Sequence, residues 1–191
     1  MSYLAGAIRG AAQRFGQRTA VVNADGTIVT YAELDSRADT AAAALDRDGV
    51  SERTVVALTM PSNVDYLATY LGAAKLGAVA AGINPRLAGP ERDAILDHLR
   101  PGTVAAGPDR PSVIVFTSGT GGTPKGAMFG DAQLAAVCAI DTGQAEPWDG
   151  GGPIIASTQF CHIGFMTKLP WYLRTGSTLL LQDRWRASTT L

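Results

Sequence analysis

The chain has 191 residues, of which 46% are hydrophobic and 17% are charged, a composition typical of a globular protein of this length. Its formal charge of −1 provides no field for nucleic acid or acidic membranes, so nucleic-acid binding is disfavoured. The most apolar stretch, residues 67–83, contains Lys75 and three glycines and is too interrupted to span a bilayer. The first residues do not form a secretory signal, so we expect a cytoplasmic protein without a transmembrane segment.

The first fifty residues predict a helix, a β-hairpin and a second helix. Apolar residues at helical spacing indicate the first helix, which should stop near Gly16. Two strand-like runs then flank Asp25-Gly26, which is a strong short hairpin signal. Thr30 and Glu33 form a capping box that opens the second helix.

Beyond residue 50 the pattern alternates between strands and helices. Strands are predicted over residues 54–60, 78–83 and 103–106, with a helix capped by Ser62 and a shorter helix beginning at Pro90 between them. This order of β, α, β, α, β implies an α/β fold with a parallel-rich sheet layered with helices.

Residues 112–126 are an apolar run that breaks into a loop of glycines and hydroxyls and ends in one lysine. Residues 113–116 show no polar alternation, as expected of a strand that is covered on both faces of a parallel sheet. The loop therefore leaves the carboxyl end of a buried strand, where ligands bind in open α/β sheets. Its glycines let backbone amides approach an anion, its hydroxyls add donors, and its lysine supplies positive charge. The segment predicts a phosphate-binding loop made of Thr117, Ser118, Gly119, Thr120, Gly121, Gly122, Thr123 and Lys125.

Two better-known phosphate motifs do not fit this loop. The Walker form needs a glycine directly before the lysine, whereas Lys125 follows Pro124, and the third glycine of the dinucleotide pattern also falls on Pro124. The alternatives to phosphate binding are a flexible turn without a ligand and a solvated surface lysine at Lys125.

After the loop, the sequence predicts a helix over residues 131–140, a strand over 153–157, a helix near Leu169 and a strand over 177–181. Cys138 and Cys161 lack the paired spacing of a zinc or redox site, and we expect two buried or half-buried thiols.

The glycine loop closely resembles the phosphate-binding loop of the adenylate-forming (AMP-binding) superfamily, which contains acyl-CoA synthetases, peptide-synthetase adenylation domains and luciferases. Its usual form is Tyr/Phe-Thr-Ser-Gly-Thr-Thr-Gly-x-Pro-Lys-Gly, and only Gly121 departs from it. Other segments resemble the amino-terminal portion of acyl-CoA synthetases in the same order along the chain: residues 30–34, 49–50, 55–58, 77–79, 84–87, 160–164 and 176–181.

The resemblance implies ATP-dependent activation of a carboxylic acid to an acyl adenylate and then to an acyl-CoA thioester. ATP and Mg²⁺ would be required, and coenzyme A would be the co-substrate. The loop would wrap the β and γ phosphates and Lys125 would act as the catalytic cation, whereas no protein residue is expected to bind a metal. His162 would line the acyl pocket where it meets the nucleotide, with Phe160 and Ile163 as apolar neighbours. A purely structural role for His162 is the alternative.

The resemblance also implies a domain division. Residues 1–110 would form a shortened first α/β lobe, and residues 111–191 the start of a second lobe with the loop. Asp131 stands where relatives commonly have a histidine. The carboxy-terminal lid domain is absent from the sequence, so we expect this chain alone to be a poor catalyst. The alternative is a catalytically inactive ATP-binding or scaffolding module that self-associates or is completed by another chain.

Overall fold

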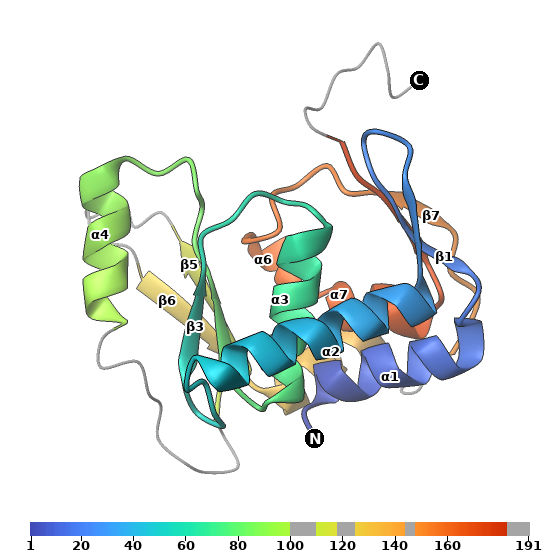
Figure 1. Ribbon diagram of the computed structural model, residues 1–191, viewed down its shortest axis with the longest axis horizontal. Coiled ribbons are helices and arrows are strands. Elements are labelled where there is room, and N and C mark those ends of the chain that lie inside the picture. The colour runs from blue at the N-terminus through green and yellow to red at the C-terminus, as the bar shows by residue number, and fades with distance from the viewer. Residues whose placement is uncertain (100–109, 118–124, 144–147, 183–191) are drawn as a thin grey trace.

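The computed structural model describes residues 1–99, 110–117, 125–143 and 148–182. Within these residues the chain forms two four-stranded sheets with helices packed between and around them (Figure 1). The predicted strand over residues 103–106 and the loop residues 118–124 lie outside the described residues.

The first sheet joins the amino-terminal hairpin to strands that come late in the chain. Its order is β2-β1-β8-β7, with β1 and β2 antiparallel and the β1–β8 and β7–β8 pairs parallel. Val21 lies opposite Leu179, and Thr178 Oγ1 donates a hydrogen bond to the Thr19 carbonyl at 2.8 Å. The strands of this sheet are β1 (Thr19–Val22), β2 (Ile28–Thr30), β7 (Pro153–Ile155) and β8 (Thr178–Leu180).

The second sheet carries the predicted phosphate loop. Its order is β3-β4-β5-β6, in which the first three strands are parallel and β6 runs antiparallel to β5. The α/β class with parallel-rich sheets is therefore confirmed. The strands are β3 (Val55–Leu58), β4 (Val79–Gly82), β5 (Val113–Thr117) and β6 (Lys125–Phe129).

Strand β6 is absent from the sequence-based prediction, which treated Lys125 only as the end of a loop. The strand contains Gly126 and is short, and most of its residues are exposed, so it has neither the alternation nor the continuous apolar run of a typical strand. It forms because it pairs along its whole length with β5. Each sheet combines strands from both sides of residue 110, and the division into two lobes at that residue stays a prediction.

Seven helices are described in these residues, and most of them pack between the two sheets. Figure 1 shows α1 and α2 side by side along one edge, α3 and α7 in the middle, and α4 apart from them beside the second sheet. The helices are α1 (Tyr3–Phe15), α2 (Tyr31–Arg47), α3 (Val64–Lys75), α4 (Gly89–His98), α5 (Asp131–Thr142), α6 (Ile163–Met166) and α7 (Leu169–Arg174).

The contact between α2 and α3 depends on small residues. A Cβ atom at Gly72 would lie 2.8 Å from the Ala42 backbone nitrogen, so only glycine allows the two helices to approach this closely. The Lys75 ammonium group is buried in the same interface and pairs with Asp35 and Asp39. This arrangement holds α3 firmly at the centre of the molecule, directly after strand β3.

The predicted N-cap is correct for helix α2 and wrong for helix α3. The capping box of α2 is confirmed, because Thr30 N donates to Glu33 Oε2 at 2.8 Å and Glu33 N donates to Thr30 Oγ1 at 3.2 Å. The predicted cap of α3 by Ser62 is wrong. Asn63 caps this helix instead, with its Oδ1 accepting from Tyr66 N at 3.0 Å, because the extended backbone of Asn63 starts the helix one residue later.

Candidate active site

The two ends of the predicted phosphate loop lie side by side. Thr117 ends β5, Lys125 begins β6, and the two residues are direct partners in the antiparallel pair. Residues 113–115 of β5 are buried, as predicted for this strand. The Lys125 side chain is exposed at the edge where the parallel strands have their carboxyl ends. The hairpin therefore presents a positive charge at the position where ligands bind in α/β sheets.

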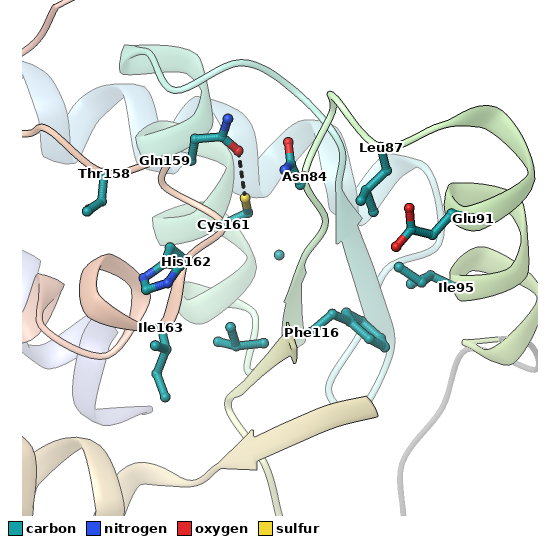
Figure 2. Close-up of a pocket in the computed structure, with 12 residues that line it drawn as sticks. Asn84, Leu87, Glu91, Ile95, Phe116, Thr158, Gln159, Cys161, His162 and Ile163 are labelled. Atoms are coloured by element: carbon teal, nitrogen blue, oxygen red, sulfur yellow. Dashed lines mark hydrogen bonds between the residues drawn. The ribbon is translucent and has the colours of Figure 1, made fainter. Parts of the chain in front are cut away.

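A cavity of about 560 Å³ adjoins the strand from which the loop leaves (Figure 2). Four segments form its walls: the end of β4, the end of β5, α4 with the turn before it, and the chain leading into α6. Its surface is largely apolar with a few polar groups, which is the usual character of a small-molecule site. The lining residues are Gly82, Asn84, Leu87, Glu91, Ile95, Val115, Phe116, Thr158, Gln159, Cys161, His162 and Ile163.

A glycine on β4 sets how closely two of these walls approach each other. A Cβ atom at Gly82 would lie 3.0 Å from the Cys161 Cα atom and would also clash with the Met166 sulfur. The absence of a side chain at Gly82 therefore lets the chain around Cys161 and helix α6 pack onto strand β4.

His162 lies at the edge of this cavity. It caps α6, and its Nδ1 accepts a hydrogen bond from the Gly164 backbone nitrogen at 3.2 Å. An accepting Nδ1 places the proton of the neutral ring on Nε2. The ring is exposed and borders the cavity together with Ile163 (Figure 2). The structure thus brings His162 and Ile163 to the cavity, as expected from the sequence.

Phe160 does not line the cavity, although it was expected there as a neighbour of His162. Its side chain is 1% exposed and lies in the hydrophobic core, stacked on Phe165 at 3.9 Å between ring centroids and edge-on to Tyr66 at 5.6 Å. Its backbone nitrogen donates to Ser62 Oγ at 2.9 Å. Gln159 and Cys161, the chain neighbours of Phe160, both line the cavity. By packing in the core, Phe160 therefore holds this part of the cavity wall in place.

Both thiols are buried, as predicted. Cys161 borders the cavity, but burial raises the pKa of its thiol above the ordinary value, which keeps it in the protonated form at neutral pH. Its Sγ contacts Gln159 Oε1 at 3.6 Å (Figure 2). A protonated thiol is a weak nucleophile, so Cys161 serves as a wall residue.

Asp131 occupies the position where related loops are commonly followed by a histidine. Its Oδ1 accepts from Ser112 Oγ at 2.6 Å and its Oδ2 accepts from Tyr3 N at 2.9 Å. The carboxylate therefore connects the start of β5 to helix α1. Through these two bonds it holds the strand that carries the phosphate loop against the rest of the fold.

A second, more polar cavity of about 810 Å³ lies next to the first. It is lined by residues that follow β3, β4 and β7, among them Asn63, Arg86 and Ser157. Thr158 and Gln159 line both cavities, so the two share a wall.

The α4 residues that line the first cavity were not predicted from the sequence. Glu91 and Ile95 lie four residues apart on α4, a spacing that places them on one face of the helix, and Leu87 lies in the turn before it. That signal was present, but the face of α4 that meets the cavity could not be known without the fold.

The part of the chain that the structure describes contains neither a side-chain cluster for a metal ion nor a membrane-spanning helix. No group of three or more histidine, cysteine or acidic side chains is arranged there to hold a metal ion. No helix in the described ranges is long and apolar enough to cross a membrane.

Comparison with known proteins places the chain in a family. The family of AMP-binding enzymes matches residues 8–105 and 101–191. The long-chain-fatty-acid–CoA ligase FadD13 of Mycobacterium tuberculosis is 34% identical over 146 residues, which cover 52% of this chain and 29% of that protein. The indoleacetate–CoA ligase of Aromatoleum aromaticum is 28% identical over 215 residues, which cover 85% of this chain and 42% of that protein. The chain thus spans less than half the length of these relatives.

Solved structures show the same fold. The N-terminal domain of FACL13 from Mycobacterium tuberculosis superimposes with a TM-score of 0.79 at 23% identity, over 100% of this chain and 59% of that one. The o-succinylbenzoate CoA synthetase MenE from Bacillus subtilis gives a TM-score of 0.79 at 20% identity, over 96% of this chain and 57% of that one. With a sequence match along nearly its whole length and this shared fold, the chain belongs to the family of AMP-binding enzymes.

Proposed function

We propose that this chain is the amino-terminal portion of an acid–CoA ligase that forms an acyl adenylate from ATP. The main support for the proposal is that the cavity and the predicted phosphate loop lie next to each other at the end of β5. Phe116 lines the cavity, and the next residue along β5, Thr117, is the first residue of the predicted phosphate loop and the direct partner of Lys125. A triphosphate held by the loop would therefore lie next to an acyl group held in the cavity.

The proposed reaction has two steps. A carboxylate oxygen of the acid attacks the α-phosphorus of ATP, the bond to the bridging oxygen of the β-phosphate breaks, and pyrophosphate leaves with the electron pair. The sulfur of coenzyme A, as thiolate, then attacks the acyl carbon, and AMP leaves with the electrons of the carbon–oxygen bond. Both steps gather negative charge on phosphate oxygens, so the catalyst mainly needs positioned donors and cations.

The residues of this chain have distinct roles in that scheme. Loop amides and hydroxyls from Thr117 to Thr123 would hold the β and γ phosphates, and Lys125 would neutralise the departing pyrophosphate. His162 would border the acyl group, with its Nε2–H as a donor. Mg²⁺ would supply further charge on the phosphate oxygens.

A second candidate is a catalytically inactive ATP-binding or scaffolding module of the same family. Exposed apolar side chains near the loop hairpin and on α5, such as Met128 and Ile140, would promote self-association or docking of a complementing chain. For either candidate we propose a cytoplasmic location.

Calorimetry and a turnover assay on this chain test the proposal. We expect saturable binding of ATP with Mg²⁺ and, when a carboxylic acid and coenzyme A are added, slow release of pyrophosphate that depends on the acid. Binding without acid-dependent release would favour the inactive module. If ATP with Mg²⁺ does not bind at all, the ligase and the ATP-binding module are both wrong, and only a scaffolding role remains.

A further inference from the structure

The apolar surface that the acyl cavity offers to a ligand comes from a few side chains on opposite walls. Ile95 and Val115 line the cavity but are each only 2% exposed. Leu87 and Phe116 on the α4 side and Ile163 on the α6 side are partly exposed, so their carbon atoms are accessible to an acyl group. Phe116 supplies the one benzene ring among the described residues that line the cavity.

The ring of Phe116 is held in place by the hairpin of β5 and β6. Phe116 and Gly126 are direct partners in this antiparallel pair. A Cβ atom at position 126 would lie 3.3 Å from the Phe116 Cε1 atom, so the glycine lets the ring lie close against the backbone of β6. The ring also packs against the small cluster of Val79, Ala81 and Ile114. It is therefore a fixed surface, which a ligand can contact without first ordering a mobile side chain.

Phe116 also lies at the reacting end of the proposed site. The next residue, Thr117, begins the predicted phosphate loop and pairs with Lys125. Figure 2 shows Phe116 on the α4 side of the cavity, across from His162 and Ile163. The reacting carboxylate must lie near the loop, because it attacks the α-phosphorus of the nucleotide held there. The acyl atoms nearest to Phe116 are therefore those attached to the carboxylate, and the rest of the acyl group would extend toward Ile163.

We propose that the ring of Phe116 selects acids in which an aromatic ring is attached to the reacting carboxylate directly or through one carbon atom. This inference rests on the proposed function, since it assigns the cavity to the acyl group. Two aromatic rings in offset-stacked or edge-to-face contact gain free energy beyond that of the buried area. A saturated ring of the same size buries at least as much apolar surface but lacks this gain. Phe116 is thus a specificity-determining residue for arylcarboxylic and arylacetic acids.

Ligand-observed NMR titrations of this chain test the proposal with pairs of acids of matched size. Benzoate is compared with cyclohexanecarboxylate, and phenylacetate with cyclohexylacetate. In each pair we expect the aromatic acid to bind about fivefold more tightly, which is the gain typical of one aromatic contact. A third pair, 6-phenylhexanoate and 6-cyclohexylhexanoate, places the ring far from the carboxylate. The affinities within this pair should differ by less than about twofold.

Variants at two phenylalanines separate this role from a structural one. Phe116→Leu keeps an apolar side chain and removes the ring, so the preference for the aromatic acids should fall below about twofold. Phe116→Tyr retains the ring and should keep the preference. Phe129→Leu is the matched control and should also keep it, because Phe129 is a partly buried residue of the same hairpin that packs against the main core instead of the cavity. Circular dichroism checks that each variant retains the fold.

The outcomes decide the proposal separately from the nucleotide function. Equal affinities within the benzoate and phenylacetate pairs in the wild-type chain overturn it, as does the absence of binding of all six acids. A preference that survives Phe116→Leu, or that is equally large for 6-phenylhexanoate, also overturns it. Titrations of the same wild-type samples with ATP and Mg²⁺ report on the proposed function, so binding of ATP without any preference for aromatic acids removes this inference alone.

Discussion

Replacing Lys125 by alanine is expected to weaken the binding of ATP with Mg²⁺ by about 2 kcal/mol, or roughly 30-fold. In our account the Lys125 ammonium group forms a charge-assisted contact with phosphate oxygens, and its removal leaves those oxygens without their protein cation. The side chain is exposed at the first residue of β6, and circular dichroism of the variant checks that the fold is retained. Calorimetric titration of the wild-type and variant chains measures the difference in affinity.

A matched control shows whether the effect is specific. Arg47→Ala removes another exposed cation, one that lies at the end of α2 and donates to the Ala43 carbonyl of the same helix. This variant should bind ATP with an affinity within a factor of about two of the wild-type chain, because screening weakens the influence of a distant charge. Equal affinities for the wild-type and Lys125→Ala chains would remove the lysine from the site.

Replacing Phe160 by alanine is expected to lower the free energy of unfolding by about 3–5 kcal/mol. The ring is 1% exposed and contacts Phe165 and Tyr66, so its removal leaves a cavity that the surrounding core cannot fully close. Urea denaturation followed by circular dichroism measures this loss through the unfolding midpoint. Because Phe160 anchors the cavity wall, the variant should also bind acids more weakly than the wild-type chain.

Ile163→Ala is the control for the Phe160 variant. Ile163 lies three residues further along and is 38% exposed, so we expect a loss of less than about 1 kcal/mol. A similar loss in both variants would show that Phe160 is not the anchor described here.

Local signals in the sequence predicted most of the elements correctly. The capping pattern at Thr30 and Glu33 fixes the start of α2, and the Asp25-Gly26 turn fixes the hairpin of β1 and β2, because in each case the interacting residues are close in sequence. The run from Val113 to Phe116 predicted a buried strand for the same reason, since its composition alone indicates burial on both faces.

The pairing of distant segments could not be predicted in the same way. Strands β1 and β8 are neighbours although more than a hundred residues separate them, and no local pattern encodes which strand lies beside which. Strand β6 is short and exposed and forms only through its pairing with β5. These contacts determine the shape of the sheets around the site.

The residues that line the cavity could not be predicted from local sequence patterns either. The sequence indicated that the chain near His162 was functional, but Phe160 turns into the core and Glu91 reaches the cavity from a helix that lies about seventy residues earlier in the chain. Which side chains face a cavity depends on how the helices pack, and that packing is set by many weak contacts spread over the whole fold.

The loop from Thr117 to Lys125 is proposed to hold the phosphates of ATP. Backbone amide NMR of the ¹⁵N-labelled chain during titration with ATP and Mg²⁺ measures this directly. We expect saturable shifts of the amides of residues 117–123 and 125–126, with the same dissociation constant as in calorimetry, and smaller shifts in α1 and α2. Saturable shifts elsewhere with unchanged loop amides, or no shifts at millimolar ATP, would contradict the account.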